Sequence, residues 1–68
     1  MATFNEISEK ICSELPEYFE ISVSLEKDAG YVELYDRRSG RYIEYPTDYS
    51  SLIQQMEDAL EYAKQATQ

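Results

Sequence analysis

The acidic side chains and the tyrosines are the residues of this sequence whose types and spacing suggest a function. The 68 residues include fourteen Asp and Glu against six Lys and Arg, a formal net charge of −8, together with seven tyrosines. A carboxylate can transfer protons, hold a metal ion or bind a cation, and a tyrosine offers a large rigid surface with a hydroxyl. The spacing of these residues decides among the roles.

Catalytic and metal-binding roles find no support in the sequence. It holds no histidine, which excludes a histidine general base, a Ser-His-Asp triad and histidine metal ligands. One cysteine, Cys12, cannot form a thiolate zinc site, and both glycines fall in predicted hairpin turns rather than in a phosphate-binding loop. No spacing of acids matches a calcium-binding loop or selects one pair for acid-base catalysis. We therefore predict that the protein is not an enzyme and binds no cofactor and no metal.

The net charge favours a basic partner protein. A charge of −8 repels nucleic acid and anionic membranes and attracts basic surfaces. No apolar run approaches the roughly 20 residues of a membrane span, and the first residues lack the layout of a signal peptide. We therefore expect a soluble, cytoplasmic protein that contacts neither nucleic acid nor membrane directly.

The first predicted element is a helix over residues 4–15. Thr3 and Glu6 have the spacing of a capping box, apolar residues recur at helical spacing, and Pro16 ends the helix. Cys12 borders the apolar stripe, and we predict that it fills a small space in the core rather than acting as a reactive thiol, because no basic cluster lies near it in the sequence.

A second helix is predicted at the other end of the chain, over residues 48–66. Thr47 or Asp48 is expected to cap it. Its apolar stripe consists of Tyr49, Leu52, Ile53, Met56, Leu60 and Ala63. Acidic residues and glutamines cover its outer face.

Three strands are predicted between the helices. The first shows the strict alternation of apolar and polar residues that is typical of a half-buried strand. Gly30 is expected to adopt a positive φ in the first hairpin turn, residues 37–40 form the second turn, and Pro46 is expected to end the third strand. The predicted strands are residues 18–27, 31–36 and 41–45.

The predicted fold class is α+β, with a helix, a three-stranded antiparallel meander and a helix in a single acidic α-β-β-β-α domain over residues 1–68. A sheet with one apolar face needs a cover, and each helix has one apolar stripe. We therefore expect both helices on one sheet face, which leaves the other face open to water.

The open face is the predicted binding surface. Two residues along a strand span about 6.6 Å and neighbouring strands lie about 4.8 Å apart, so acids on this face have spacings that a phosphate backbone also presents. Tyrosines between them would anchor a partner. Its candidate partner-binding residues are Glu20, Glu26, Tyr31, Glu33, Tyr35, Tyr42 and Glu44. Acids on the last helix form a second candidate surface, Glu57, Asp58 and Glu61.

Two features of these surfaces allow alternatives. An open sheet face is normally polar, and glutamates with tyrosines are a common solvated mixture, although Glu20, Glu33 and Glu44 are expected to be neighbours that repel one another. Arg37, Arg38 and Arg41 form a basic hairpin that could bind an acidic partner or a phosphate. The same arginines could instead be solvated or fold back onto nearby carboxylates, where an exposed pair contributes about 0–1 kcal/mol.

The element order and length are also those of the double-stranded-RNA-binding domain. That family contacts phosphates through lysines at the start of its last helix, and residues 47–51 here contain no basic residue. In size, acidity and element order the chain resembles the small acidic anti-CRISPR proteins of phages. That resemblance implies a phage inhibitor that imitates DNA and occupies the basic channel of an effector protein.

Together these observations favour a small acidic inhibitor that docks on the basic nucleic-acid-binding surface of a partner protein, as a nucleic-acid mimic. The alternative is a structural or regulatory small subunit or homodimer of unknown role. The sequence is compatible with a monomer and with a homodimer.

Overall fold

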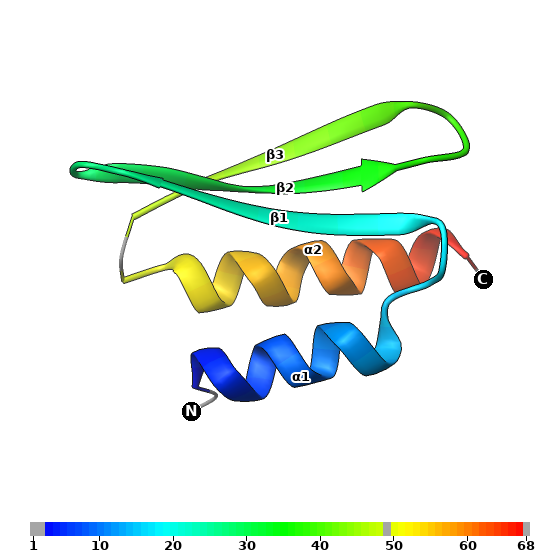
Figure 1. Ribbon diagram of the computed structural model, residues 1–68, viewed down its shortest axis with the longest axis horizontal. Helices are drawn as coiled ribbons and strands as arrows, with labels where there is room; N and C mark the ends of the chain where they lie inside the picture. Colours follow the sequence, from blue (N-terminus) through cyan, green and yellow to red (C-terminus); the bar gives the residue numbers. More distant parts are fainter. Residues whose placement is uncertain (1–2, 49, 68) are drawn as a thin grey trace.

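A computed structural model describes residues 3–48 and 50–67 and confirms the α+β architecture. The elements are α1 (Phe4–Glu14), β1 (Phe19–Glu26), β2 (Ala29–Asp36), β3 (Arg41–Thr47) and α2 (Leu52–Ala66). The strands form one antiparallel sheet in the order β1-β2-β3. In Figure 1, α2 lies next to the sheet and α1 lies on the far side of α2, so both helices are on one side of the sheet.

The first helix begins with the predicted capping box. The Thr3 hydroxyl accepts a hydrogen bond from the Glu6 N–H at 3.2 Å, and the Glu6 carboxylate accepts one from the Thr3 N–H at 3.3 Å. Ile7 and Ile11 are buried against the core. Cys12 is exposed, so its predicted place in the core was wrong. Each residue of a helix turns by about 100°, which carries the Cys12 side chain past the buried stripe that Ile11 occupies.

The first hairpin turn is tighter than predicted. Glu26 pairs with Ala29, so only two residues form the loop, and the positive φ of 64° belongs to Asp28 rather than to Gly30. Two-residue hairpin loops require a positive φ, which Asp tolerates. Gly30 lies inside β2 instead, where a Cβ atom would come within 2.8 Å of the carbonyl oxygen of Ser24.

The third strand continues beyond its predicted end. It includes Pro46, which pairs with Tyr31, and reaches Thr47. The prediction that Pro46 closes the strand was wrong because β3 is an edge strand, and an edge strand tolerates a residue without an N–H group.

The second helix begins later than predicted, at Leu52, with Ser51 at the capping position and no side-chain hydrogen bond to cap it. Neither predicted cap was correct, because the Asp48 carboxylate is held in a turn before the helix. It accepts hydrogen bonds from the N–H groups of Ser50 at 3.0 Å and Ser51 at 3.1 Å. Hydrogen bonds from these two serines lower the pKa of Asp48 below its usual value, against a smaller opposing effect of burial. Tyr49, predicted in the apolar stripe, lies outside the described residues.

The core lies between α2 and the sheet face that α2 covers. Val32 and Leu34 of the central strand are fully buried there, and α2 contacts all three strands. The buried residues are Ile7, Ile11, Phe19, Val32, Leu34, Leu52, Met56, Ala59, Leu60 and Ala63. The helices of the described ranges lack the length and apolar character needed to cross a membrane.

Candidate functional site

The strand register arranges the open face in three cross-strand rows. Neighbours along a strand point to opposite faces, and the burial of Val32 and Leu34 turns the residues on either side of them outward. The acidic row is Ser22, Glu33 and Glu44; the tyrosine row is Glu20, Tyr35 and Tyr42; the third row is Ser24, Tyr31 and Pro46. No helix of residues 3–48 and 50–67 covers these rows, as Figure 1 shows.

The acidic row places two carboxylates directly opposite each other. Glu33 of β2 and Glu44 of β3 are Cα partners in the register, and like charges in that relation are destabilising. Neither side chain forms an ion pair with any residue of the described ranges. Glu20 is less close than expected, because it stands opposite Tyr35 and is only a diagonal neighbour of Glu33. Both carboxylates of the Glu33–Glu44 pair therefore remain available to an external cation.

Aromatic side chains flank this carboxylate pair. Tyr35 and Tyr42 are Cα partners whose rings stack with centroids 4.7 Å apart and an interplanar angle of 29°. Tyr42 is 62% exposed. On the other side of the acidic row, Tyr31 stands opposite Pro46. The structure thus brings the tyrosines predicted as anchors next to the acids, with the two repelling carboxylates between the Tyr35–Tyr42 stack on one side and Tyr31 on the other.

The remaining predicted acids lie away from this centre. Glu26 pairs with Ala29 at the β1–β2 hairpin, at the far end of the open face from Glu20. The predicted acids of α2 belong to the other side of the sheet, since α2 packs against the covered face. They are Glu57, which is half-buried, and Asp58 and Glu61, which are exposed. The two predicted surfaces are therefore separate.

The helical acids also have neighbours of their own. The Gln54 amide donates a hydrogen bond to the Asp58 carboxylate at 2.9 Å. Burial, together with the nearby Tyr62 and Asp58, raises the pKa of Tyr45 on β3. The hydrogen bond from Gln54 distinguishes Asp58 from Glu33 and Glu44 of the open face, which form no ion pair within the described ranges.

Two of the three arginines at the second hairpin fold back onto the protein. The Arg37 guanidinium donates a hydrogen bond to the carbonyl oxygen of Glu17. The Arg38 guanidinium lies 3.5 Å from the centre of the Tyr18 ring and its Nε is 3.7 Å from the Asp36 carboxylate. Arg38 thus folds back onto a carboxylate, which is one of the two alternatives expected from the sequence, whereas Arg37 bonds to a backbone carbonyl instead.

Asp36 organises this hairpin. Its carboxylate accepts a hydrogen bond from the Arg38 N–H at 2.9 Å, and the Gly40 N–H closes the turn onto its carbonyl at 2.8 Å. Burial raises the pKa of Asp36, but hydrogen bonds from Arg38 and Ser39 and the charge of Arg38 outweigh it and leave the pKa below its usual value. Asp36 is therefore ionised at neutral pH, and its carboxylate is bonded to Arg38 within the turn.

Metal binding was not expected from the sequence. In the ranges 3–48 and 50–67, no group of three or more His, Cys, Asp or Glu side chains is arranged to hold a metal ion.

Comparison of the chain with family models, with curated proteins and with solved structures finds no match.

Proposed function

We propose that this protein is a small acidic inhibitor that docks its open face on the basic nucleic-acid-binding surface of a partner protein, as a nucleic-acid mimic in the manner of phage anti-CRISPR proteins. The observation that carries the proposal is the Glu33–Glu44 pair. Two unpaired carboxylates face each other across the strands, between stacked tyrosines on one side and Tyr31 on the other. This arrangement costs stability in the free protein and fits a cationic partner.

An arginine side chain of the partner matches this site best. Its planar guanidinium donates several hydrogen bonds to carboxylates and also stacks on aromatic rings. Seated between Glu33 and Glu44, it would neutralise their repulsion while its plane contacts Tyr35 or Tyr42, where a cation–π contact adds about 0.5–2 kcal/mol. The arginines of nucleic-acid-binding surfaces are the groups that otherwise contact phosphates.

The rest of the molecule supports fast, salt-sensitive association. A net charge of −8 raises the rate of encounter with a basic surface, and this rate falls as ionic strength rises. Tyrosine anchors would hold the complex once water has left the interface, since such residues dominate binding energy at the centre of interfaces. We expect the association rate to depend on total charge and the dissociation rate to depend on the open face.

The first experiment identifies the partner by its chemistry. The immobilised protein is incubated with cell lysate, bound proteins are eluted with a salt gradient, and each recovered protein is then tested with duplex DNA as a competitor. We expect a nucleic-acid-binding protein that elutes at moderate salt and that DNA displaces. Recovered proteins that DNA does not displace would refute mimicry.

Charge reversal then locates the surface. Glu33→Lys/Glu44→Lys should abolish binding to the recovered protein, whereas Asp58→Lys/Glu61→Lys on α2 makes the same change in net charge outside the open face. Circular dichroism checks that both variants fold. An equal loss of affinity in the two variants would show that net charge, and not the open face, determines binding. A loss confined to the α2 variant would assign the interface to the helix.

A structural or regulatory homodimer is the second candidate, and the free edge of β1 favours it. A groove of about 540 Å³ separates β1 from α1 and is lined by Ile11, Leu15 and Ile21 among others. At the opposite ends of the same two elements, Leu25 of β1 is 51% exposed and Phe4 of α1 is 48% exposed. Unpaired strand edges with apolar neighbours are prone to pair with other chains.

Sedimentation separates the two candidates. A homodimer joined through β1 should sediment as a dimer at low and at high salt, and more stably at high salt because the repulsion between two acidic protomers is screened. An inhibitor that acts as a monomer should sediment as a monomer in both buffers. A stable dimer whose formation is lost in Leu25→Lys would support the homodimer.

A further inference from the structure

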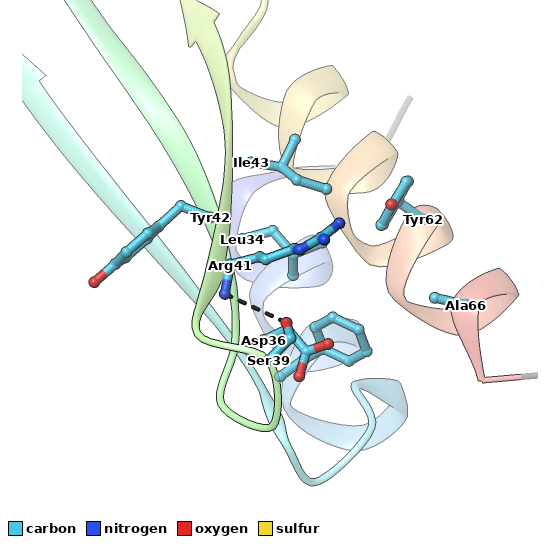
Figure 2. Close-up of a pocket in the computed structure, with 9 residues that line it drawn as sticks. Leu34, Asp36, Ser39, Arg41, Tyr42, Ile43, Tyr62 and Ala66 are labelled. Carbon is cyan, nitrogen blue, oxygen red and sulfur yellow. Dashed lines mark hydrogen bonds between the residues drawn. The ribbon is translucent and has the colours of Figure 1, made fainter.

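A second surface feature lies on the helix side of the sheet, away from the open face. A cavity of about 480 Å³ lies between the second hairpin and the C-terminal half of α2. Figure 2 shows it with Leu34 and Ile43 at the sheet, Arg41 and Ser39 at the hairpin, and Tyr62 on the helix. This volume is within the range of about 300–1,000 Å³ that is typical of small-molecule sites.

Arg41 is the distinctive group of this cavity. It belongs to the helix-facing side of β3, and in Figure 2 its side chain extends across the cavity toward α2 while the Tyr42 side chain points away from it. Asp36 is the Cα partner of Arg41 and would be its natural counter-ion. The Asp36 carboxylate instead bonds to the Arg38 N–H and pairs with the Arg38 side chain.

The Arg41 guanidinium is therefore left without an anionic partner among residues 3–48 and 50–67, where the ion pairs are those of Arg38 and Lys64. The backbone N–H of Arg41 donates a hydrogen bond to the Ser39 hydroxyl at 3.3 Å, which does not involve the guanidinium. An arginine fork offers a geometry that matches a carboxylate with two parallel hydrogen bonds. Arg41 is one of six basic residues in the chain, and its guanidinium faces the cavity without an ion pair in the described ranges.

Beyond Asp36 and Ser39, which lie beside the arginine, much of the cavity wall is apolar. Phe19 is 6% exposed and Leu34 is 1% exposed, so only small parts of these side chains form the floor, and Ile43 and Ala66 continue it. Tyr62, which is 50% exposed, adds a ring and a hydroxyl from α2. A ligand must therefore combine one anionic group with an apolar body.

We propose that this cavity binds a small organic carboxylate whose body is an aromatic ring or a branched hydrocarbon. The carboxylate pairs with the Arg41 guanidinium, and the body lies on Leu34 and Ile43 beside the Tyr62 ring. The charge of −8 and the ionised Asp36 at the cavity oppose anions of higher charge, so a single negative charge is required. Polyphosphates and nucleic acid are excluded on the same ground.

This site does not depend on the proposed inhibitor function. The cavity is on the helix side of the sheet, whereas the side chains of the acidic and tyrosine rows are on the other side; Tyr42 lines the cavity, but its side chain points away from it. A variant of Arg41 should therefore leave docking of the open face unchanged, and Glu33→Lys/Glu44→Lys should leave the cavity intact.

The test is a titration followed by nuclear magnetic resonance of the isotope-labelled protein. The probes are 1-naphthoate, its uncharged analogue 1-naphthamide, and inorganic phosphate. We expect saturable shifts with 1-naphthoate at the Leu34, Ile43 and Ala66 methyl groups, and at least tenfold weaker binding of the other two. No saturable shift with 1-naphthoate, or equal binding of 1-naphthamide, would overturn the proposal.

A pair of variants assigns the charge. Arg41→Gln should weaken 1-naphthoate binding by about tenfold or more, the usual effect of losing a hydrogen-bonded charge. Lys27→Gln, at the opposite hairpin, makes the same change in net charge and should bind 1-naphthoate as the unmodified protein does. Unchanged binding in Arg41→Gln, or an equal loss in both variants, would show that Arg41 does not hold the carboxylate.

Discussion

Neutralising one member of the Glu33–Glu44 pair should make the free protein more stable. The two residues are directly opposed on β2 and β3 and have no cation beside them among the described residues. Replacing Glu44 by Gln keeps the shape of the side chain and removes one charge. Because Glu44 is exposed and Glu33 half-buried, the substitution changes little besides the repulsion.

The expected gain follows from the geometry of the sheet. Directly opposed Cβ atoms lie about 4.5–5.5 Å apart, which allows carboxylate charges roughly 6 Å apart. At that distance two like charges repel by about 0.7 kcal/mol in water and by about 3 kcal/mol at the effective dielectric constant of a protein surface. The exposure of Glu44 favours the lower value, so Glu44→Gln should stabilise by about 0.5–1 kcal/mol, in line with cross-strand pairs in general. For a domain of this size that gain raises Tm by about 2–8 °C.

A double-mutant cycle isolates the repulsion. Glu33→Gln and Glu44→Gln each remove the same pairwise interaction, so the double variant should be scarcely more stable than either single variant. The difference between the sum of the single effects and the double effect is the coupling energy. Thermal unfolding followed by circular dichroism at pH 7, in low salt and in 1 M salt, measures all four proteins. Since the Debye length is about 3 Å at 1 M ionic strength, the coupling should nearly vanish there.

Three results would refute this reasoning. A Tm of Glu44→Gln at or below that of the unmodified protein would show that no repulsion is relieved. Additive single effects would show that the two carboxylates do not interact. A coupling energy that persists in 1 M salt would show that its origin is not electrostatic.

Two further predictions concern stability. Leu34→Ala removes a side chain that is 1% exposed at the centre of the core. Such a loss costs about 2–5 kcal/mol, which approaches the roughly 3–5 kcal/mol that one small core supplies. Circular dichroism on heating should therefore show no cooperative transition, and a normal transition would contradict the assigned core. The Lys64 ammonium donates a hydrogen bond to the Glu14 carboxylate at 2.7 Å. This bond lowers the pKa of Glu14 below 4.5; burial opposes the shift in part, and the charges of Lys64 and Lys10 add to it. The unfolded state therefore binds more protons near pH 4.5, so this contribution is present above that pH and is lost as pH falls through the lowered pKa. Glu14→Gln should lower Tm at pH 7 and have no effect at a pH below the lowered value, and an equal effect at both would contradict the ion pair.

The sequence was sufficient to predict the sheet because its periods are strong. Alternation of apolar and polar residues in β1 and β2 determines which side chains turn to the core, and an error of two residues in the first turn leaves the same side chains on each face. The open face was therefore predicted residue by residue, and the acidic and tyrosine residues lie on it as expected. The opposition of Glu33 and Glu44 required the register itself, which depends on a two-residue turn at Asp28.

The errors have local causes that pattern alone does not reveal. Residues 48–51 look like the start of a helix, yet the Asp48 carboxylate bonds to the N–H groups of Ser50 and Ser51 and forms a turn there. Pro46 was read as a stop because its place on an edge strand depends on the sheet order. The Arg41 cavity was not predicted either. It exists because Asp36 forms its ion pair with Arg38 and not with Arg41, its cross-strand partner, and because Tyr62 lies opposite the hairpin.

The distribution of stability across the sheet explains why a domain this small can retain a repulsive pair. All of the described apolar residues that are buried lie on the helix side of the sheet or in the helices, so changes of charge on the open face do not reach the core. Repulsion between Glu33 and Glu44 of about 0.5–1 kcal/mol is a tolerable fraction of roughly 3–5 kcal/mol. Binding of a cation between them would recover that energy and add to it. If selection acted on stability alone, one glutamine at either position would remove the cost, and retention of the pair is what the proposed docking of a cationic partner would account for.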